Sequence, residues 1–513
     1  MTEPTSSLER ERKLTAPDDL SADDLASTLQ SLGTVKREPV RKLTAVYYDT
    51  DDYRLARARI TLRRRTGGND AGWHLKLPPD ELNGDGRHEV TLPLRAGPPG
   101  QVPTALSDSL IAITAGAELR PLATQLTRRL PFTVTDASGA SAVEVVDDTV
   151  TVTEGRHAGA EYRELEVEVL SSPELLEPTV QALTHAGAAP SASKSKGVRA
   201  LVGDVELPPL VDPGPRPKPK DPASAAVAFH VRTQVAAIIE QDQRVRRQLP
   251  DAVHQYRVAA RRLRSVLQAF LPLVDEEWAR HLREELDWIA SVMGQSRDRE
   301  VLEQRLVDAV RTLPAEVDAA AALVAIQKQL DAELDEANAS IDEALKSERY
   351  RRLMQTLHAA SADPPTTSLA EGKAMKVLPP LVEARWRKLA KRAKKLHNEM
   401  DGHDEHWHKA RILAKKARYT VEACIPVFGS PAKKLAKQLE TVTDLLGEHQ
   451  DAAMAAALLQ QLATSSRGSR SAFALGILYA QQRQQVAQCR ARFVESWPGV
   501  SHSKWRAWME PKK

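Results

Sequence analysis

The spacing of apolar residues changes about two-fifths of the way along the chain. Before residue 204, short segments alternate apolar and polar residues between Gly, Pro and Asp turns, which predicts antiparallel β-strands. After residue 221, long stretches rich in Ala, Leu, Arg and Glu repeat apolar residues three and four positions apart, which predicts α-helices. The pattern therefore predicts an α+β protein of two domains, a sheet domain followed by an all-α domain.

A proline-rich segment separates the two patterns. Seven prolines fall between Pro208 and Pro222, and they prevent regular helix or sheet, which leaves a stiff extended spacer. We expect a sheet domain over residues 5–203, a linker over 204–221 and a helical domain over 222–511. Two domains also agree with the length, because 513 residues are too many for one ordinary core.

The two halves differ in charge. From Asp221 onward the chain has 45 Lys+Arg and 37 Asp+Glu, whereas the residues before it have 27 and 32. A basic helical half favours a polyanionic partner. The start of the chain lacks the apolar run of a secretory signal, and no apolar run is long enough to span a bilayer, so we expect a cytoplasmic protein without a membrane partner. Cys424 and Cys489 lack paired-thiol spacing, which argues against disulfides and thiolate zinc sites.

Charged residues occupy one face of several predicted strands. In SLERERKLTAP, Glu9, Glu11 and Lys13 share a face, and neither face of that strand is apolar. Other strands place charge on one face in the same way, with Arg63 and Arg65, with His74 and Lys76, or with Glu164, Glu166 and Glu168. Water on the charged side of an open sheet would explain any one of these strands taken alone.

The signs of these charges are segregated among the strands. One strand has only carboxylates on this face and another only guanidinium groups, whereas an ordinary solvated face mixes both signs. If the sheet closes into a barrel, the charged faces line its lumen. Carboxylates bind a hard divalent cation, and clustered Arg and Lys bind a multiply charged anion. The pattern therefore predicts a tunnel that holds a metal ion and a polyphosphate.

An ordered series of motifs resembles the CYTH, or triphosphate tunnel metalloenzyme, family. The series starts with the ExExK signature of Glu9, Glu11 and Lys13 and continues through YYDT, LRRR, LKLP, an Arg-x-Glu, TRR, ELEVE and a closing KSK. The resemblance covers roughly residues 5–203 and implies an eight-stranded antiparallel β-barrel tunnel with flanking helices that binds a triphosphate. The family includes inorganic, thiamine and RNA triphosphatases and class IV adenylyl cyclases.

The resemblance also implies roles for individual residues. It implies catalytic roles for Glu9, Glu11 and Lys13, and Mg²⁺ or Mn²⁺ bound by Glu9, Glu11, Asp147, Glu164 and Glu166. It implies triphosphate binding by Lys13, Arg63, Arg65, Lys76, Arg129, and Lys194 or Lys196. Asp148 stays open as an alternative to Asp147, which is preferred for its spacing from Glu144. Arg128 stays open as an alternative to Arg129, because neighbours on a strand face opposite ways.

The helical half contains an internal repeat. The segment HQYRVAARRLR from His254 matches HKARILAKKAR from His408 with an offset of 154 residues. Farther along, GQSRD from Gly294 matches GEHQD from Gly447 with an offset of 153 residues. Two copies of a helical unit predict two related bundles around a pseudo-twofold axis.

Cations line one side of each repeated helix. At 100° per residue, His254, Arg257, Arg261 and Arg264 cluster on the side away from the apolar residues. Acidic partners four residues away, which would normally accompany a solvated basic face, are missing from both segments. A polyanion is therefore the expected partner. Nucleic acid is disfavoured, because aromatic residues make up only 4% of the chain and none interrupts the basic stripe after Tyr256.

These basic helices and the later RD and HQD elements resemble a CHAD domain over about residues 222–511. The resemblance implies two pseudo-symmetric four-helix bundles that bind long-chain inorganic polyphosphate, often at polyphosphate granules. The contacts that it implies are His254, Arg257, Arg261, Arg264, His408, Arg411, Lys415 and Arg418.

Together, the two resemblances predict a metal-dependent inorganic triphosphatase that hydrolyses tripolyphosphate and carries a polyphosphate-binding helical module. One alternative is a non-catalytic polyphosphate-binding or granule-associated protein. Another is an adenylyl cyclase or organic triphosphatase, because the same tunnel charges suit any triphosphate.

Overall fold

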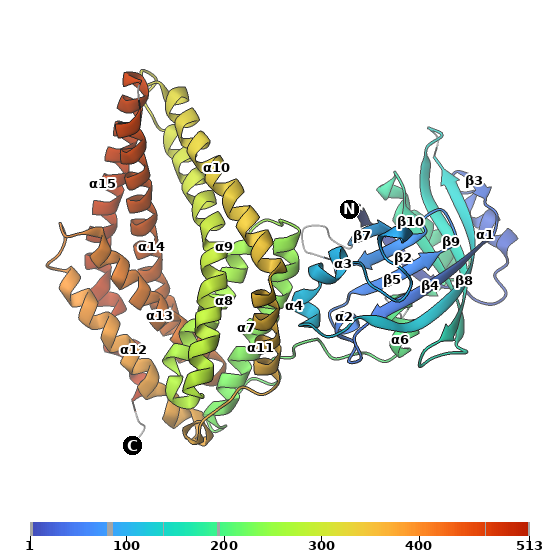
Figure 1. The fold of residues 1–513 in the computed structure, drawn as a ribbon, viewed down its shortest axis with the longest axis horizontal. Coiled ribbons are helices and arrows are strands. Elements are labelled where there is room, and N and C mark those ends of the chain that lie inside the picture. Colours follow the sequence, from blue (N-terminus) through green and yellow to red (C-terminus); the bar gives the residue numbers. More distant parts are fainter. Residues whose placement is uncertain (1–3, 80–85, 137, 192–194, 467, 511–513) are drawn as a thin grey trace. The chain divides into compact units, whose positions relative to one another are not determined.

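The computed structural model describes residues 4–79, 86–136, 138–191, 195–466 and 468–510. The chain forms two compact units, Met1–Leu210 and Val211–Lys513. Figure 1 shows that strands dominate the first unit and that the second is entirely helical, as the change in apolar spacing predicts.

The first unit is built on an antiparallel sheet of eleven strands. In chain order these are β1 (Thr5–Glu9), β2 (Glu11–Thr15), β3 (Thr34–Arg37), β4 (Arg41–Asp49), β5 (Thr61–Thr66), β6 (Gly72–Lys76), β7 (Arg87–Pro93), β8 (Arg120–Thr135), β9 (Ser141–Glu154), β10 (Glu161–Val169) and β11 (Ala189–Pro190). Their order across the sheet is β1-β7-β6-β5-β4-β8-β9-β10-β2-β11, and β3 pairs with β8.

Hydrogen bonds do not close this sheet into the expected barrel. β1 lies at one end of the sheet, beside β7, and β2 lies between β10 and the short β11 at the other end, yet only Arg10 separates β1 from β2 along the chain. The carbonyl oxygen of Arg10 accepts a hydrogen bond of 3.0 Å from Val169 N. If β1 and β2 are taken as one interrupted strand, eight strands remain besides the short β3 and β11, which accounts for the expected number.

Helices α1 and α5 pack on the outer, apolar face of the sheet. The helices of this unit are α1 (Ala22–Leu29), α2 (Arg54–Arg57), α3 (Thr104–Ser109), α4 (Ile111–Thr114), α5 (Leu176–His185) and α6 (Lys196–Val202). Leu25 of α1 and Leu183 of α5 share a core with Phe132, Leu165 and Val167. Because successive strand residues face opposite ways, packing Leu165 and Val167 outward turns their charged neighbours inward.

The second unit repeats one arrangement of helices. It contains α7 (Ala223–Arg246), α8 (Ala252–Ala269), α9 (Glu276–Val310), α10 (Ala319–Lys346), α11 (Glu348–Ala362), α12 (Ala374–Leu396), α13 (Asp404–Phe428), α14 (Ser430–Ser465) and α15 (Ser469–Val500). The repeated basic segments lie on α8 and α13. Leu306, Ile326, Leu459 and Leu475 belong to one apolar cluster, so α9, α10, α14 and α15 share a core across the two copies. Among the described residues, no helix has the length and hydropathy needed to cross a bilayer.

Asp49 fixes the turn that follows β4. Its side chain is fully buried, and its carboxylate accepts hydrogen bonds from the backbone N–H groups of Thr50 at 2.7 Å, Leu55 at 2.9 Å and Ala56 at 3.0 Å. The turn needs this support because Tyr53 adopts the left-handed conformation, with φ of 57°. Asp49 therefore holds α2 against the strand that carries Tyr47.

We expect Asp49→Ala to destabilise the sheet unit by about 2–4 kcal/mol, because it leaves buried N–H donors without an acceptor. Differential scanning calorimetry of the full chain should show the melting temperature of this unit lowered by about 5–15 °C. Asp49→Asn keeps one carbonyl acceptor and should cost less. Equal melting temperatures for Asp49→Ala and the unaltered protein would contradict this role.

Candidate functional site

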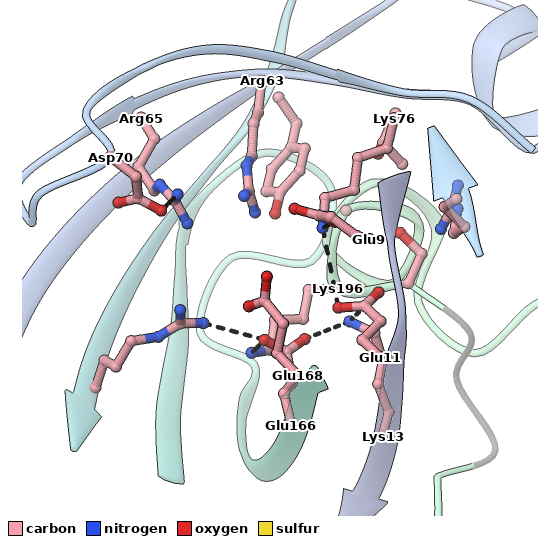
Figure 2. Close-up of a pocket in the computed structure, with 16 residues that line it drawn as sticks. Glu9, Glu11, Lys13, Arg63, Arg65, Asp70, Lys76, Glu166, Glu168 and Lys196 are labelled. Carbon is pink, nitrogen blue, oxygen red and sulfur yellow. Dashed lines mark hydrogen bonds and ion pairs between the residues drawn. The ribbon is translucent and has the colours of Figure 1, made fainter. Parts of the chain in front are cut away.

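The charged inner faces of the strands meet in one cavity (Figure 2). It encloses about 600 Å³ of space that no atom fills, part of it open to solvent. Its lining comes from eight strands, a loop and the start of α6: Glu9, Glu11, Lys13, Tyr47, Thr61, Arg63, Arg65, Asp70, Lys76, Arg87, Arg129, Glu166, Glu168, Ser195, Lys196 and Gly197. Strands far apart in sequence therefore contribute both signs of charge to one space.

Strand register places opposite charges across from one another. Lys13 of β2 lies opposite Glu166 of β10, and Lys76 of β6 lies opposite Glu89 of β7. Such neighbours have their Cβ atoms about 5 Å apart, which is close enough for an ion pair. The pairing of the strands thus determines which charges neutralise each other.

One group of paired charges surrounds Asp148 and Glu166. The Arg129 guanidinium donates two hydrogen bonds to Asp148, of 2.9 and 2.7 Å, and one of 3.0 Å to Glu166. Lys196 contacts Asp148 and lies 3.0 Å from Glu166. Lys13 also contacts Glu166. Burial opposes ionisation of Glu166, but Lys13, Lys196 and Arg129 outweigh it and hold its pKa well below the usual value.

Asp147 does not join this group, contrary to the preference for it over Asp148. It lies on the outer face of β9, where Arg163 donates two hydrogen bonds of 2.8 and 2.9 Å to its carboxylate. In β9, Asp148 shares the inner face with Glu144, four residues away, whereas Asp147 lies on the other face. For the TRR pair, the structure places Arg129 in the cavity and leaves Arg128 exposed.

A second group of paired charges lies around Glu89. Lys76 contacts Glu9 and lies 3.9 Å from Glu11 and 4.0 Å from Glu89. His74 Nδ1 is 3.0 Å from Glu89 Oε1, and His74 Nε2 is 2.8 Å from the Asp70 carbonyl oxygen. Neither Glu89 nor His74 was assigned a site role from the sequence. His74 in β6 and Glu89 in β7 each alternate with residues that face outward, and this alternation could have identified both as inward-facing.

Burial opposes the charges of Glu9 and Arg65, although each has a partner of opposite sign, Lys76 for Glu9 and Asp70 for Arg65. Burial, together with neighbouring Glu89, raises the pKa of Glu9 to about 7, even though Lys76 opposes the shift. Burial, followed by the positive charges of Arg63 and Arg129, lowers the pKa of Arg65 to about 9. A cation near Glu9 and an anion near Arg65 would each relieve this strain.

Glu164 provides the test of whether a metal ion fits. Its side chain is 2% exposed, and neither carboxylate oxygen accepts a hydrogen bond. Burial raises its pKa, although Lys13 and Lys196 lie 3.6 and 3.7 Å away. Within the described part of the chain, no three acidic or histidine side chains form a ready-made metal site. The oxygen donors still suit Mg²⁺ or Mn²⁺, and Glu9, Glu11, Asp148, Glu164 and Glu166 are the residues that would hold it.

The KSK segment enters the cavity through α6. Ser195 caps this helix by accepting a hydrogen bond of 3.4 Å from Val198 N, and Lys196 begins it. Lys194 lies outside the described residues. Gly197 has no room for a side chain, because a Cβ atom there would lie 2.5 Å from Tyr47 Cε1. Close packing on Tyr47 therefore explains a glycine directly after Lys196.

In the helical unit, four of the predicted cations lie close together: Arg257 and Arg261 of α8, and Arg411 and Lys415 of α13. These four residues are called the basic group. Burial, followed by the charges of Arg411 and Arg261, lowers the pKa of Lys415 to about 7. Such repulsion within a partly buried cluster is relieved when an anion binds.

The other predicted contacts of the helical unit lie differently. Arg264 pairs with Asp287, and Arg418 pairs with Glu422 at 2.7 Å and Glu440 at 2.8 Å. The expected lack of acidic partners is therefore wrong at these positions, since Asp287 and Glu440 come from neighbouring helices and Glu422 lies just past the searched segment. Arg257 also donates a hydrogen bond of 2.9 Å to Asp298.

The two predicted histidines are half-buried. His408 Nδ1 is 2.8 Å from Gln450 Oε1. Burial lowers the pKa of His254.

Comparisons with known proteins match both units. A CYTH domain model matches residues 7–199, and a CHAD domain model matches residues 230–460. Two proteins from two strains of Mycobacterium tuberculosis, named Uncharacterized protein MT2285 and Uncharacterized protein Rv2226, are each 33% identical to this chain over 524 residues, which covers 95% of this chain and 95% of theirs.

Two solved structures share 26% sequence identity with parts of the chain. PptA from Streptomyces chartreusis has a TM-score of 0.48 and covers 54% of this chain and 100% of its own. The CHAD domain from the plant Ricinus communis has a TM-score of 0.45 and covers 56% of this chain and 95% of its own.

The CYTH match lies in the first unit and the CHAD match in the second. The two mycobacterial proteins each align with 95% of this chain. The chain belongs to the family of proteins in which a CYTH domain is followed by a CHAD domain.

Proposed function

We propose that the protein is a divalent-metal-dependent inorganic triphosphatase that converts tripolyphosphate and water to pyrophosphate and orthophosphate. The CYTH domain assigns the chain to the superfamily of triphosphate tunnel hydrolases and cyclases, which depend on metal. The observation that carries the proposal is the convergence of carboxylates and Arg and Lys side chains in one cavity.

The residues of the cavity suit distinct parts of this reaction. Arg63, Arg65 and Arg129 would grip phosphate oxygens, since a planar guanidinium binds phosphate through two hydrogen bonds. Lys13 and Lys76 would exchange their present carboxylate partners for phosphate oxygens. A bound Mg²⁺ or Mn²⁺ would neutralise charge that develops on the phosphate oxygens. A carboxylate of the cavity would accept a hydrogen bond from the attacking water and orient it.

We further propose that the helical unit binds long-chain polyphosphate through the basic group. A linear polyanion suits a row of cations from two helices, and binding would place the protein at cytoplasmic polyphosphate granules. The helical unit would then concentrate the enzyme where phosphate chains are stored.

The proposed hydrolysis predicts different defects for carboxylate and arginine variants. We expect Glu11→Gln to lower kcat for orthophosphate release from tripolyphosphate by about 100-fold or more, because it removes a metal ligand. Arg63→Ala should mainly raise KM, because it removes a substrate contact. Initial rates at varied tripolyphosphate, with Mg²⁺ or Mn²⁺, measure both constants. The reverse assignment of the two defects would contradict these roles.

The same assay separates the proposal from its alternatives. A non-catalytic phosphate-binding protein would release no orthophosphate from any substrate, and its signal would equal that of a Glu9→Gln/Glu11→Gln control. An organic triphosphatase would prefer ATP or thiamine triphosphate over tripolyphosphate, and an adenylyl cyclase would produce cyclic AMP and pyrophosphate from ATP. Faster turnover of tripolyphosphate than of either organic substrate is the result that supports the proposal.

Adjacent residues of β9 give a matched test of the inner face. We expect Asp148→Asn to lower kcat/KM at least about tenfold, because it removes a negative charge that orients Arg129 and Lys196. Asp147→Asn changes the next residue, on the outer face, and should leave kcat/KM within about twofold. Thermal melting of both variants checks that they fold. Similar kinetic losses in the two variants would argue against this division of the faces.

Polyphosphate binding is expected to weaken as pH rises through 7. Lys415 faces Arg411 on its own helix, Arg257 and Arg261 on α8, and Asp451 on α14. Its pKa near 7 means that it loses its positive charge between pH 6 and pH 8. We expect the affinity for long-chain polyphosphate, measured by calorimetry, to fall by up to about tenfold over this range, since a charged hydrogen bond contributes about 1.5 kcal/mol.

Two substitutions on α13 isolate the contribution of Lys415. Lys415→Arg keeps its charge over the whole range and should remove most of the pH dependence. Lys409→Arg is the control, since Lys409 is exposed and pairs with Glu405 at 2.7 Å. Unchanged pH dependence in Lys415→Arg would assign the titration to another group.

A further inference from the structure

Four further cations of the helical unit lie beside the basic group, and within the described part of the chain none of them pairs with a carboxylate. They are Arg283 of α9, Arg385 and Lys388 of α12, and Lys416 of α13. The sequence did not place them among the polyphosphate contacts. Lys388 is exposed and the other three are half-buried, so solvent reaches all four residues. These four residues are called the flanking group.

The packing of four helices brings the flanking group together. α12 packs against both α8 and α13, and α8 packs against α9. The Arg385 guanidinium donates a hydrogen bond to the carbonyl oxygen of Gln268, one turn along α8 from Arg264. Arg264 pairs with Asp287, which lies four residues after Arg283 on α9. Residues three or four apart on a helix have their Cβ atoms about 5–6 Å apart, so Arg283 and Arg385 both lie near Arg264.

The cations of this surface repel one another. The pKa of Lys416 is lowered by burial and by four surrounding cations, Arg385, Arg264, Arg283 and Lys388. Burial, followed by the charge of Arg283, also lowers the pKa of Arg385. An anion bound among these side chains would relieve the repulsion.

The internal repeat shows which carboxylate is missing here. Arg262 of α8 pairs with Glu422 of α13 at 3.1 Å. At an offset of 154 residues, Lys416 is equivalent to Arg262 and Gln268 is equivalent to Glu422. Gln268 is uncharged, so Lys416 lacks the kind of partner that neutralises Arg262.

The flanking group continues the surface of the basic group along α8. Arg264 lies one turn beyond Arg261, between the two groups. From Arg257 to Gln268, the residue that Arg385 contacts, α8 extends about 16 Å, at about 1.5 Å per residue. Three linked phosphates are shorter than this distance, so tripolyphosphate cannot extend over both groups, whereas a longer chain can.

This surface suits an inorganic phosphate chain better than a nucleic acid. Each phosphate of a linear chain carries negative charge, which matches a run of cations. Single-stranded nucleic acid also needs aromatic faces on which its bases stack. Trp386, next to Arg385, does not provide one, because it is 4% exposed and its ring is stacked on Trp497, with 5.7 Å between the centroids.

We propose that the flanking group binds polyphosphate together with the basic group, so that one long chain occupies both groups whereas tripolyphosphate reaches only part of this surface. The inference rests on the proposed binding of polyphosphate to the basic group. A chain held at two linked places binds more tightly than a chain held at either place alone. The helical unit therefore selects long chains and leaves tripolyphosphate to the tunnel.

Calorimetry on the full chain tests the proposal. Long-chain polyphosphate is titrated in metal-free buffer that contains saturating tripolyphosphate, which occupies the tunnel and is not hydrolysed. We expect Lys388→Ala/Lys416→Ala to weaken binding of the long chain at least about tenfold, because the chain loses one of its two places of attachment. Lys388→Arg/Lys416→Arg keeps both charges and should retain most of the affinity. Thermal melting of both variants checks that they fold.

A second double variant is the matched control. Arg387→Ala/Lys409→Ala removes the same charge from the same two helices, α12 and α13. Both residues are exposed and already pair with carboxylates, Glu383 and Glu405. We expect this control to bind the long chain within about twofold of the unaltered protein, because exposed ion pairs contribute little.

Each contrary result has its own meaning. If the unaltered protein binds no long chain even without tripolyphosphate, the proposed polyphosphate binding fails and this inference fails with it. If the unaltered protein binds the chain but Lys388→Ala/Lys416→Ala binds it equally well, only the flanking group is refuted. Equal losses in this variant and the control would refute it as well. Binding that saturating tripolyphosphate abolishes would overturn the selection by length, and displacement by single-stranded DNA at equal concentration would assign the surface to nucleic acid.

Discussion

Mutual neutralisation of charge inside a curled sheet is the constraint on which the first unit depends. Carboxylates and cations line one cavity, and the groups of either sign would repel one another if those of the other sign were missing. Two opposite unit charges 4 Å apart attract each other by about 4 kcal/mol at an effective dielectric of about 20. Arg129 with Asp148 and Lys13 with Glu166 show this balance directly. Under the proposed function, a metal ion and a phosphate chain would take the place of these internal pairs.

Alternation in the sequence predicted the sheet and most of the cavity, because strands such as β6 and β10 have one apolar and one charged face. It failed in β9, where Val145 and Val146 are both buried and neither face is marked as the inner one. Asp147 and Asp148 were therefore hard to separate locally. The position of Arg10 between the two ends of the sheet was also hidden, since it depends on pairing of β1 and β2 with strands that are far away in sequence.

In the helical unit, the repeat was readable because two long segments match almost residue for residue. The ion pairs were harder to predict from the sequence, because a search along one helix does not find Asp287 or Glu440 on the next helix. Tertiary neighbours neutralise Arg264 and Arg418 but leave the basic group with cations in excess. The same kind of ion pair thus recurs in both copies, Arg264 with Asp287 and Arg418 with Glu440.

The junction at Arg10 also has a consequence for the order of folding. Lys13 of β2 contacts a glutamate 153 residues farther along the chain, so β2 leaves the ribosome early but is among the last strands to find its partner. Until Glu161–Val169 has been synthesised, β2 lacks its main neighbour and the acidic residues beside Arg10 stay in water. The cavity therefore takes shape only when the last long strand arrives, and a nascent chain cannot hold a ligand in it before that moment.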